Sequence, residues 1–174
     1  MTDSPAPAPR PASTRGPRLF SEEQAKAFLG LIRAGAALER ALDRGLADEQ
    51  GIGLHQFEVL LFLATSSADH SMPMTELRRR TPLSQSRVSR VVSGLEAEGL
   101  VRRETDPNDS RAVTVVLTPQ GMATFEAAKP GHHRDLEEHL FSILNDAEIR
   151  QLGTITTKLL AAEQNQRRER AILE

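Results

Sequence analysis

The sequence predicts a mainly α-helical chain that carries one small β-hairpin. Leu, Ala, Arg and Glu are abundant, whereas aromatic residues make up 3% of the 174 residues and Trp and Tyr are absent, a composition that favours helices over a β-sandwich. Apolar residues recur at helical spacing in most segments, and two short β-favouring runs are separated by turn formers. A chain of this length buries a substantial core as one domain with helical extensions.

Composition also excludes several functions. The absence of Cys rules out disulfides, thiolate metal sites and thiol-based redox sensing. No run reaches the ~18 apolar residues of a membrane span and no secretory signal begins the chain, so we expect a cytoplasmic protein without membrane contact. The net charge of −2 argues against a polycation that coats nucleic acid. Residues 75–111 nevertheless carry eight Arg against six acidic residues, a local net charge of +2.

The N-terminal 50 residues divide into a tail and a helix. Residues 1–18 hold five of the ten Pro and few apolar side chains, so we expect a disordered tail. Ser21 and Gln24 fit a capping box that opens a long helix within residues 19–50. The positions that keep helical spacing are Phe28, Leu31, Ile32, Gly35, Leu38, Leu42 and Leu46.

The central segment predicts three helices. Residues 54–64 are apolar nearly all round, as expected for a helix at the centre of a domain. Thr75 caps a short helix that ends at Arg80. Residues 81–83 then turn the chain into a helix over Ser84–Glu98, with Ser84 as its N-cap, so the last two helices form a helix-turn-helix.

A β-hairpin follows this helix pair and makes the pattern that of a winged helix-turn-helix. Val101–Thr105 and Ala112–Leu117 favour strands, and residues 106–110 favour a turn. If Asp109 and Arg111 point to one side, the carboxylate orients the guanidinium for the narrow minor groove of DNA. The alternative is an ordinary surface ion pair, worth ~0–1 kcal/mol.

The C-terminal third predicts further helices. Thr118-Pro119 supplies an N-cap and a first-turn Pro, Pro130-Gly131 should kink or break that helix, and Asn145 with Glu148 caps the last one. The two ends of the chain hold more apolar positions than a small lobe needs: Phe28, Leu31, Ile32, Leu38, Leu140, Ile143, Leu152, Ile155 and Leu159. We expect a homodimer to bury them, with an intrachain helical bundle as the alternative.

The helix over Ser84–Glu98 has two contrasting faces. Val88, Val91, Val92 and Leu95 form one apolar stripe that should face the core. The other side is small, polar and cationic, and holds Gln85, Ser86, Arg87, Ser89 and Arg90. Arg pairs with guanine and Gln with adenine, so this side suits the major groove. A solvated surface is the alternative for such a helix alone, but the preceding turn and the following hairpin favour DNA.

The stretch SQSRVSRVVSGLEAEGLVRRETDPNDSRAVTVVLTPQG resembles the recognition helix, wing and following helix of the MarR family of regulators. The resemblance rests on L-E-x-E-G-L-V, the D-x-R of the wing and L-T-P-x-G. The flanking helices match in arrangement only, and Thr81-Pro82 departs from the small residue and Gly that the family often has in this turn.

The resemblance implies a dimer whose two winged lobes bind a short inverted repeat in double-stranded DNA. Residues 19–50 would be the N-terminal dimerisation helix, 54–117 the DNA-binding lobe and 118–170 the C-terminal dimerisation helices. The recognition helix would be capped by Ser84 and would face the major groove with Gln85, Ser86, Arg87, Ser89 and Arg90. Arg111, braced by Asp109, would enter the minor groove.

The resemblance also implies a ligand-responsive repressor, commonly of its own gene, that a small phenolic or anionic effector releases from DNA. Arg33, His55, Glu58 and His132 are candidates to line the effector site, with solvent-facing or structural roles as the alternative for each. We expect no cofactor and no metal, because His132, His133 and His139 are poorly spaced as ligands.

Other functions are less compatible with the sequence. An enzyme is not expected, because the sequence has no G-x-S-x-G, G-x-G-x-x-G or Walker-type motif. The remaining alternative is a winged-helix protein that uses its lobes for protein contacts or for non-specific DNA binding. Steep salt dependence together with preference for a palindrome would separate these cases.

Overall fold

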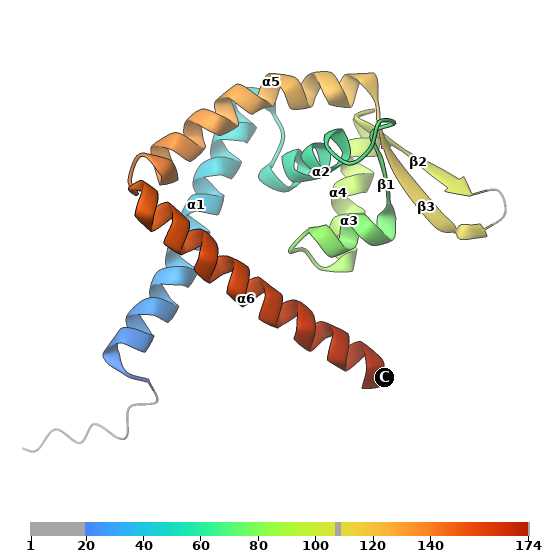
Figure 1. Cartoon of the computed structure of the whole chain (residues 1–174). Coiled ribbons are helices and arrows are strands. Elements are labelled where there is room, and N and C mark those ends of the chain that lie inside the picture. Colours follow the sequence, from blue (N-terminus) through green and yellow to red (C-terminus); the bar gives the residue numbers. More distant parts are fainter. Residues whose placement is uncertain (1–19, 107–108, 174) are drawn as a thin grey trace, which may run out of the picture. The chain divides into compact units, whose positions relative to one another are not determined.

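Helices make up most of the chain, and a small antiparallel sheet lies among them (Figure 1). The computed structural model describes residues 20–106 and 109–173, and gives the backbone alone for residues 106, 109–111, 163–164 and 166–173. The predicted tail over residues 1–18 lies outside this range. The elements in chain order are α1 (Glu22–Gln50), α2 (Leu54–Ala64), β1 (Ser71–Pro73), α3 (Met74–Arg80), α4 (Gln85–Ala97), β2 (Val101–Asp106), β3 (Asp109–Leu117), α5 (Pro119–Leu136), the π-helix η1 (Glu137–Phe141) and α6 (Asp146–Leu173).

The described chain divides into two units, and α1 runs through both. The first unit ends at Ala36 and the second begins at Ala37. The second unit therefore contains the end of α1, all three strands and every later helix. Among the described residues, no helix is long and apolar enough to cross a membrane.

The sheet has the strand order β1-β3-β2 and is antiparallel throughout. The predicted hairpin is present as β2 and β3, which project from the helices around them (Figure 1). The strand β1 was not predicted. Its three residues pair with Thr114–Val116 of β3, more than 40 positions later, so no local pattern indicates it.

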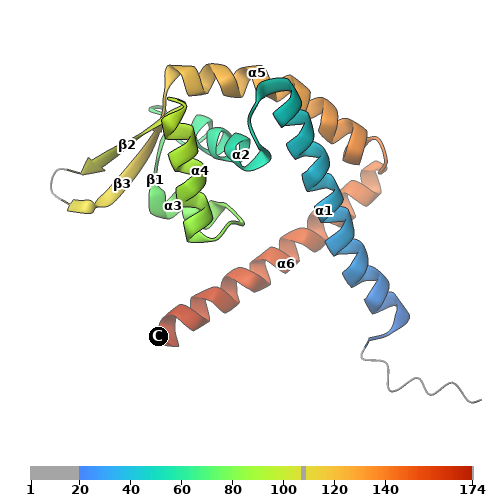
Figure 2. The same cartoon turned by 180° about the vertical axis from the view of Figure 1, so that it is seen from behind.

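One hydrophobic core holds the lobe together, and α2 supplies its centre. Phe57, Leu60 and Leu63 of α2 are at most 2% exposed, which agrees with the apolar character predicted for this helix. They pack in one cluster with Leu95 of α4 and Val115 of β3. Full burial of side chains of this kind stabilises by about 1.5–3 kcal/mol each. Figure 2 shows α4 beside the base of the hairpin, where α4 contacts β2.

Several predicted helix ends are confirmed. The capping box at Ser21 forms, since the Gln24 N–H donates to Ser21 Oγ and the Ser21 N–H donates to Gln24 Oε1. The hydroxyls of Ser84 and Thr118 accept backbone N–H groups of α4 and α5. The side chain of Asn145 likewise accepts N–H groups in the first turn of α6.

One predicted helix start is wrong. α3 begins at Met74 and its N-cap is Pro73, so Thr75 lies inside the helix, because the pairing of β1 with β3 carries the strand up to Pro73. Of the two outcomes predicted at Pro130-Gly131, the break does not occur: α5 continues through Pro130 to Leu136, and it bends along its length (Figure 1). Pro removes one helical hydrogen bond, but Ala128 and Gly131 on either side of it are buried, and tertiary packing overrides the local preference.

Candidate nucleic-acid interface

The helix α4 is held at its start by Ser84 and along its length by the core. Ser84 has extended backbone angles, and its hydroxyl accepts the N–H of Arg87 at 3.4 Å. Val88, Val92 and Leu95 are fully buried, so the predicted apolar stripe faces the core. The opposite side of α4 is therefore fixed toward solvent.

The solvent side of α4 is polar and cationic, as predicted. Gln85, Ser86, Arg87 and Arg90 are exposed. Arg87 and Arg90 form no ion pair with any side chain that the structure describes, so both guanidinium groups are available to a ligand. Ser89 differs from the other four: it is half-buried and its hydroxyl accepts a hydrogen bond from Nη2 of Arg78 at 3.1 Å.

A depression of about 560 Å³ separates α3 from the start of α4. It is lined by Thr75, Arg78, Arg79, Pro82, Leu83, Ser84 and Gln85. A helix N-terminus next to guanidinium groups attracts anions, since amide donors and positive charge converge there. The three consecutive arginines at 78–80 were visible in the sequence, but their position beside α4 was not anticipated.

One carboxylate moderates the charge of α3. Glu76 lies 2.6 Å from Arg79 and 2.9 Å from Arg80. The hydrogen bond from Arg80, with smaller contributions from the charges of Arg79 and Arg80, lowers the pKa of Glu76. Arg78 makes no such pair among the described residues, so it contributes the least compensated charge in the depression.

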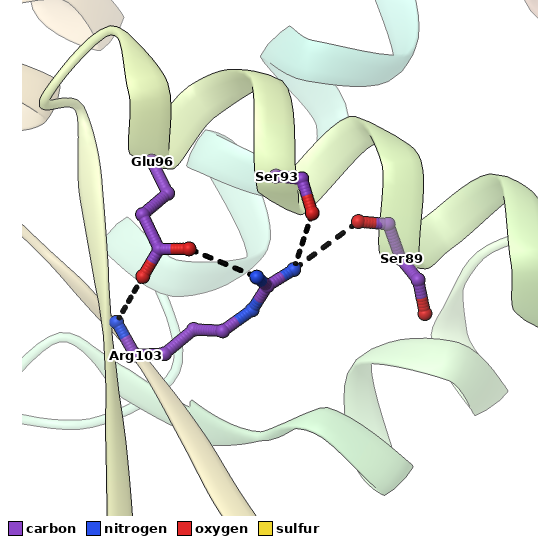
Figure 3. Close-up of polar contacts among 4 residues, drawn as sticks. All are labelled: Ser89, Ser93, Glu96 and Arg103. Atoms are coloured by element: carbon purple, nitrogen blue, oxygen red, sulfur yellow. Dashed lines mark hydrogen bonds and ion pairs between the residues drawn. The ribbon is translucent and has the colours of Figure 1, made fainter.

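Arg103 of β2 connects the hairpin to α4 (Figure 3). Its Nη1 donates to Glu96 at 2.8 Å, and its Nη2 donates to the Ser93 hydroxyl at 2.9 Å and to the Ser89 carbonyl at 3.2 Å. The backbone N–H of Arg103 also donates to Glu96, at 3.1 Å. Arg103 was not singled out in the sequence, because its partners belong to another element and follow no periodic pattern.

The hairpin residues predicted to enter the minor groove are placed only in part. The backbone of Asp109 and Arg111 belongs to β3. Their side chains lie outside the described part of the structure, so the pairing of Asp109 with Arg111 stays a prediction.

His55 and Glu58, two of the candidate effector residues, contact each other. Nδ1 of His55 lies 3.1 Å from Glu58, and Nε2 lies 3.5 Å from Glu39 of α1. The contact with Glu39 joins α2 to α1, whereas the contact with Glu58 lies within α2. Both contacts support the structural alternative for these residues.

His132, the third candidate, lies on α5. Its ring centroid is 4.4 Å from that of Phe57, and its buried Nδ1 has no hydrogen-bond partner among the described residues. Burial lowers the pKa of His132, against a smaller opposing effect of Asp135 and Glu58. Arg33, the fourth candidate, is exposed in the first unit.

Comparisons with known proteins agree on one family. Residues 50–112 match the sequence profile of the MarR family. The transcriptional repressor MprA of Escherichia coli is 31% identical over 125 residues, which are 72% of this chain and 70% of MprA.

Two solved structures have a similar fold. Sco3205 of Streptomyces coelicolor, a MarR family transcriptional regulator solved in complex with DNA, superposes with a TM-score of 0.78 at 31% identity, over 84% of this chain and 91% of Sco3205. BpsR of Bordetella bronchiseptica, whose DNA binding is regulated by 6-hydroxynicotinic acid, superposes with a TM-score of 0.70 at 28% identity, over 83% of this chain and 97% of BpsR.

Proposed function

Because this chain belongs to the MarR family of winged-helix transcriptional regulators, we propose that it is a repressor that binds a short inverted repeat of double-stranded DNA as a homodimer. The observation that carries the proposal is the solvent side of α4, where Arg87 and Arg90 are exposed without an ion-pair partner among the described residues. The structure of Sco3205 in complex with DNA supports this assignment.

Each part of the lobe has a distinct role in the proposed complex. Gln85 and Arg90 read base edges in the major groove, where a good bidentate pair discriminates by about 1–3 kcal/mol. Arg78 and Arg79 hold phosphates at the depression beside α4, and such contacts set register and orientation. Arg111 reaches the minor groove from the hairpin.

Exposed apolar side chains support the homodimer. On the first unit, Phe28 is 60% exposed and Ile32 is 58% exposed; on α6, Ile155 is 56% exposed and Leu159 is 50% exposed. Clusters of large exposed apolar residues on a soluble protein mark interaction surfaces. A two-fold symmetric dimer buries such a surface against its own copy and presents two lobes to an inverted repeat.

Release by a small effector completes the proposal. The effector is a phenolic or anionic compound, as the regulation of BpsR by 6-hydroxynicotinic acid suggests by analogy. The Nδ1 of His132, which has no hydrogen-bond partner among the described residues, is its hydrogen-bonding group, with His55 and Glu58 of the same unit as further lining candidates. A panel of phenols and aromatic carboxylates, scored for release of bound DNA, tests this part separately.

The decisive experiment is a titration against the DNA upstream of the protein's own gene at several salt concentrations. Saturable binding that exceeds binding to scrambled DNA is expected. Arg90→Ala should lose about 1–3 kcal/mol of binding free energy. Lys129→Ala is the matched control, because it removes a cation of α5 that already pairs with Glu126. Binding that equals that of scrambled DNA, or that ignores Arg90, contradicts the proposed autorepressor.

A further inference from the structure

We propose that Arg103, held by Glu96, is a positioning residue that sets the orientation of the wing relative to the recognition helix α4. The inference rests on the proposed function. In this inference, a contact between β2 and α4 fixes the angle between the hairpin and the recognition helix. That angle lets the helix enter the major groove and the hairpin enter the minor groove of the same DNA site.

The hydrogen bonds of Arg103 are directed at α4. Its two terminal nitrogens bind Glu96, Ser93 and the carbonyl of Ser89 (Figure 3). The side chain is only 28% exposed. A guanidinium with three protein acceptors in a fixed geometry is a poor candidate for a mobile phosphate contact.

Glu96 completes the attachment from the side of α4. Its Oε1 accepts the backbone N–H of Arg103 and its Oε2 accepts the guanidinium. β2 is an edge strand, so N–H groups on its outer side lack a strand partner. One carboxylate therefore satisfies an edge N–H and fixes the side chain of the same residue.

This attachment lies between the buried base of β2 and its exposed outer half, so it can orient the outer half of the hairpin. Val101, at the base of β2, is buried in the core, whereas Glu104 and Thr105 farther out are exposed. The outer half of β2 therefore has little core packing to orient it. An isolated two-stranded hairpin is marginally stable in water, so contacts at its base determine the direction of the outer half.

Ser89 extends the same network to α3. Its hydroxyl accepts Arg78 from α3, and its carbonyl accepts Arg103 from β2. The two arginines thus tie α3, α4 and β2 together at one residue of α4, on the side of the helix away from the apolar stripe.

Substitution of Glu96 by Gln tests the inference, because a positioning role and a purely electrostatic role predict opposite changes in operator affinity. Removal of a carboxylate near DNA should strengthen binding if only charge matters, because DNA is a polyanion. The positioning role predicts the opposite: Glu96→Gln weakens operator binding by about 3- to 30-fold, within the range of couplings between residues in contact. The matched control is Glu104→Gln, which removes a carboxylate that pairs within β2 with Arg102 and should leave binding unchanged or stronger.

Arg103→Lys provides a second variant that keeps the charge. Lysine lacks the planar fork needed for these simultaneous bonds, so binding should weaken as it does in Glu96→Gln. If Arg103 acted as a phosphate contact, lysine would largely preserve affinity, and Glu96→Gln would bind at least as tightly as the wild type.

Hydrogen exchange of the free protein supplies a readout that needs no DNA. Amides of residues 101–106 and 112–117 should exchange faster in Glu96→Gln than in Glu104→Gln, while α2 amides stay equally protected. Unchanged amide exchange in the hairpin of Glu96→Gln would overturn the inference, as would unchanged operator affinity in both Glu96→Gln and Arg103→Lys. Either result would leave the proposed function standing. Failure of the wild type to prefer any operator over scrambled DNA overturns the proposed function, and the inference with it.

Discussion

Replacement of Gly121 by Ala should destabilise the lobe, because the first turn of α5 crosses the chain between α4 and β2 without room for a side chain. A Cβ on Gly121 would overlap the carbonyl oxygen of Leu100, and it would lie 2.9 Å from the carbonyl carbon and 2.8 Å from Cδ1 of Leu117. The Leu100 carbonyl cannot turn away freely, since it accepts hydrogen bonds from both the N–H and the hydroxyl of Thr118 at 3.1 Å.

The size of the effect follows from the atoms involved. The Cβ would meet main chain rather than the end of a flexible side chain, so α5 and the residues before β2 have to separate. Overpacking of this kind costs about 1–3 kcal/mol and occasionally more. The better helix propensity of Ala offsets up to about 1 kcal/mol. Because the overlap is with main chain, we place the cost at the upper end of this range, about 3 kcal/mol, and expect a net loss of about 2 kcal/mol of unfolding free energy.

Gly94→Ala is the matched control within the same lobe. Gly94 lies inside α4, and its Cβ would meet only the side-chain nitrogen of Gln56, at 4.0 Å. The gain in helix propensity is then unopposed, and the variant should be more stable by about 0.5–1 kcal/mol.

Urea unfolding followed by circular dichroism at 222 nm measures both changes. Intrinsic fluorescence is a poor probe here, since the chain has neither Trp nor Tyr. All samples need one protein concentration, because association stabilises the folded chain. A Gly121→Ala midpoint at or above that of the wild type would refute the steric reasoning, as would an equal loss in Gly94→Ala.

Three further predictions use the same unfolding assay. Burial beside Phe57 lowers the pKa of His132 below its ordinary value of 6.5, so the unfolded chain takes up this proton at a higher pH than the folded chain, and stability falls as the pH drops below 6.5. His132→Gln should flatten that decline between pH 7 and pH 5; an identical slope would contradict it. Ser84→Ala removes the cap that accepts the Arg87 N–H and should cost about 0.5–2 kcal/mol, whereas Ser84→Asp should keep stability and weaken operator binding by adding negative charge. An Ala variant as stable as the wild type would rule out the cap. Leu95→Ala empties a fully buried site and should cost about 2–5 kcal/mol; a loss below 1 kcal/mol would show that Leu95 is not in the core.

The sequence by itself determined the features that depend on neighbouring residues. Ser84 and Thr118 mark helix starts because their hydroxyls accept N–H groups three residues ahead. The stripe with Val88 and Leu95 follows from the 3.6-residue period, and it separates the buried side of α4 from the polar one. These local rules, with the turn between two β-favouring runs, were enough to predict a winged helix-turn-helix.

Only the tertiary structure decided which polar residues meet. Ser89 reads as an exposed residue of α4, yet it accepts Arg78 from α3. Arg103 and Glu96 lie seven positions apart on different elements, so neither a helical nor a strand period relates them. β1 likewise exists through its pairing with β3. Such contacts depend on where packed elements bring distant side chains, and that depends on the core as a whole rather than on any local pattern.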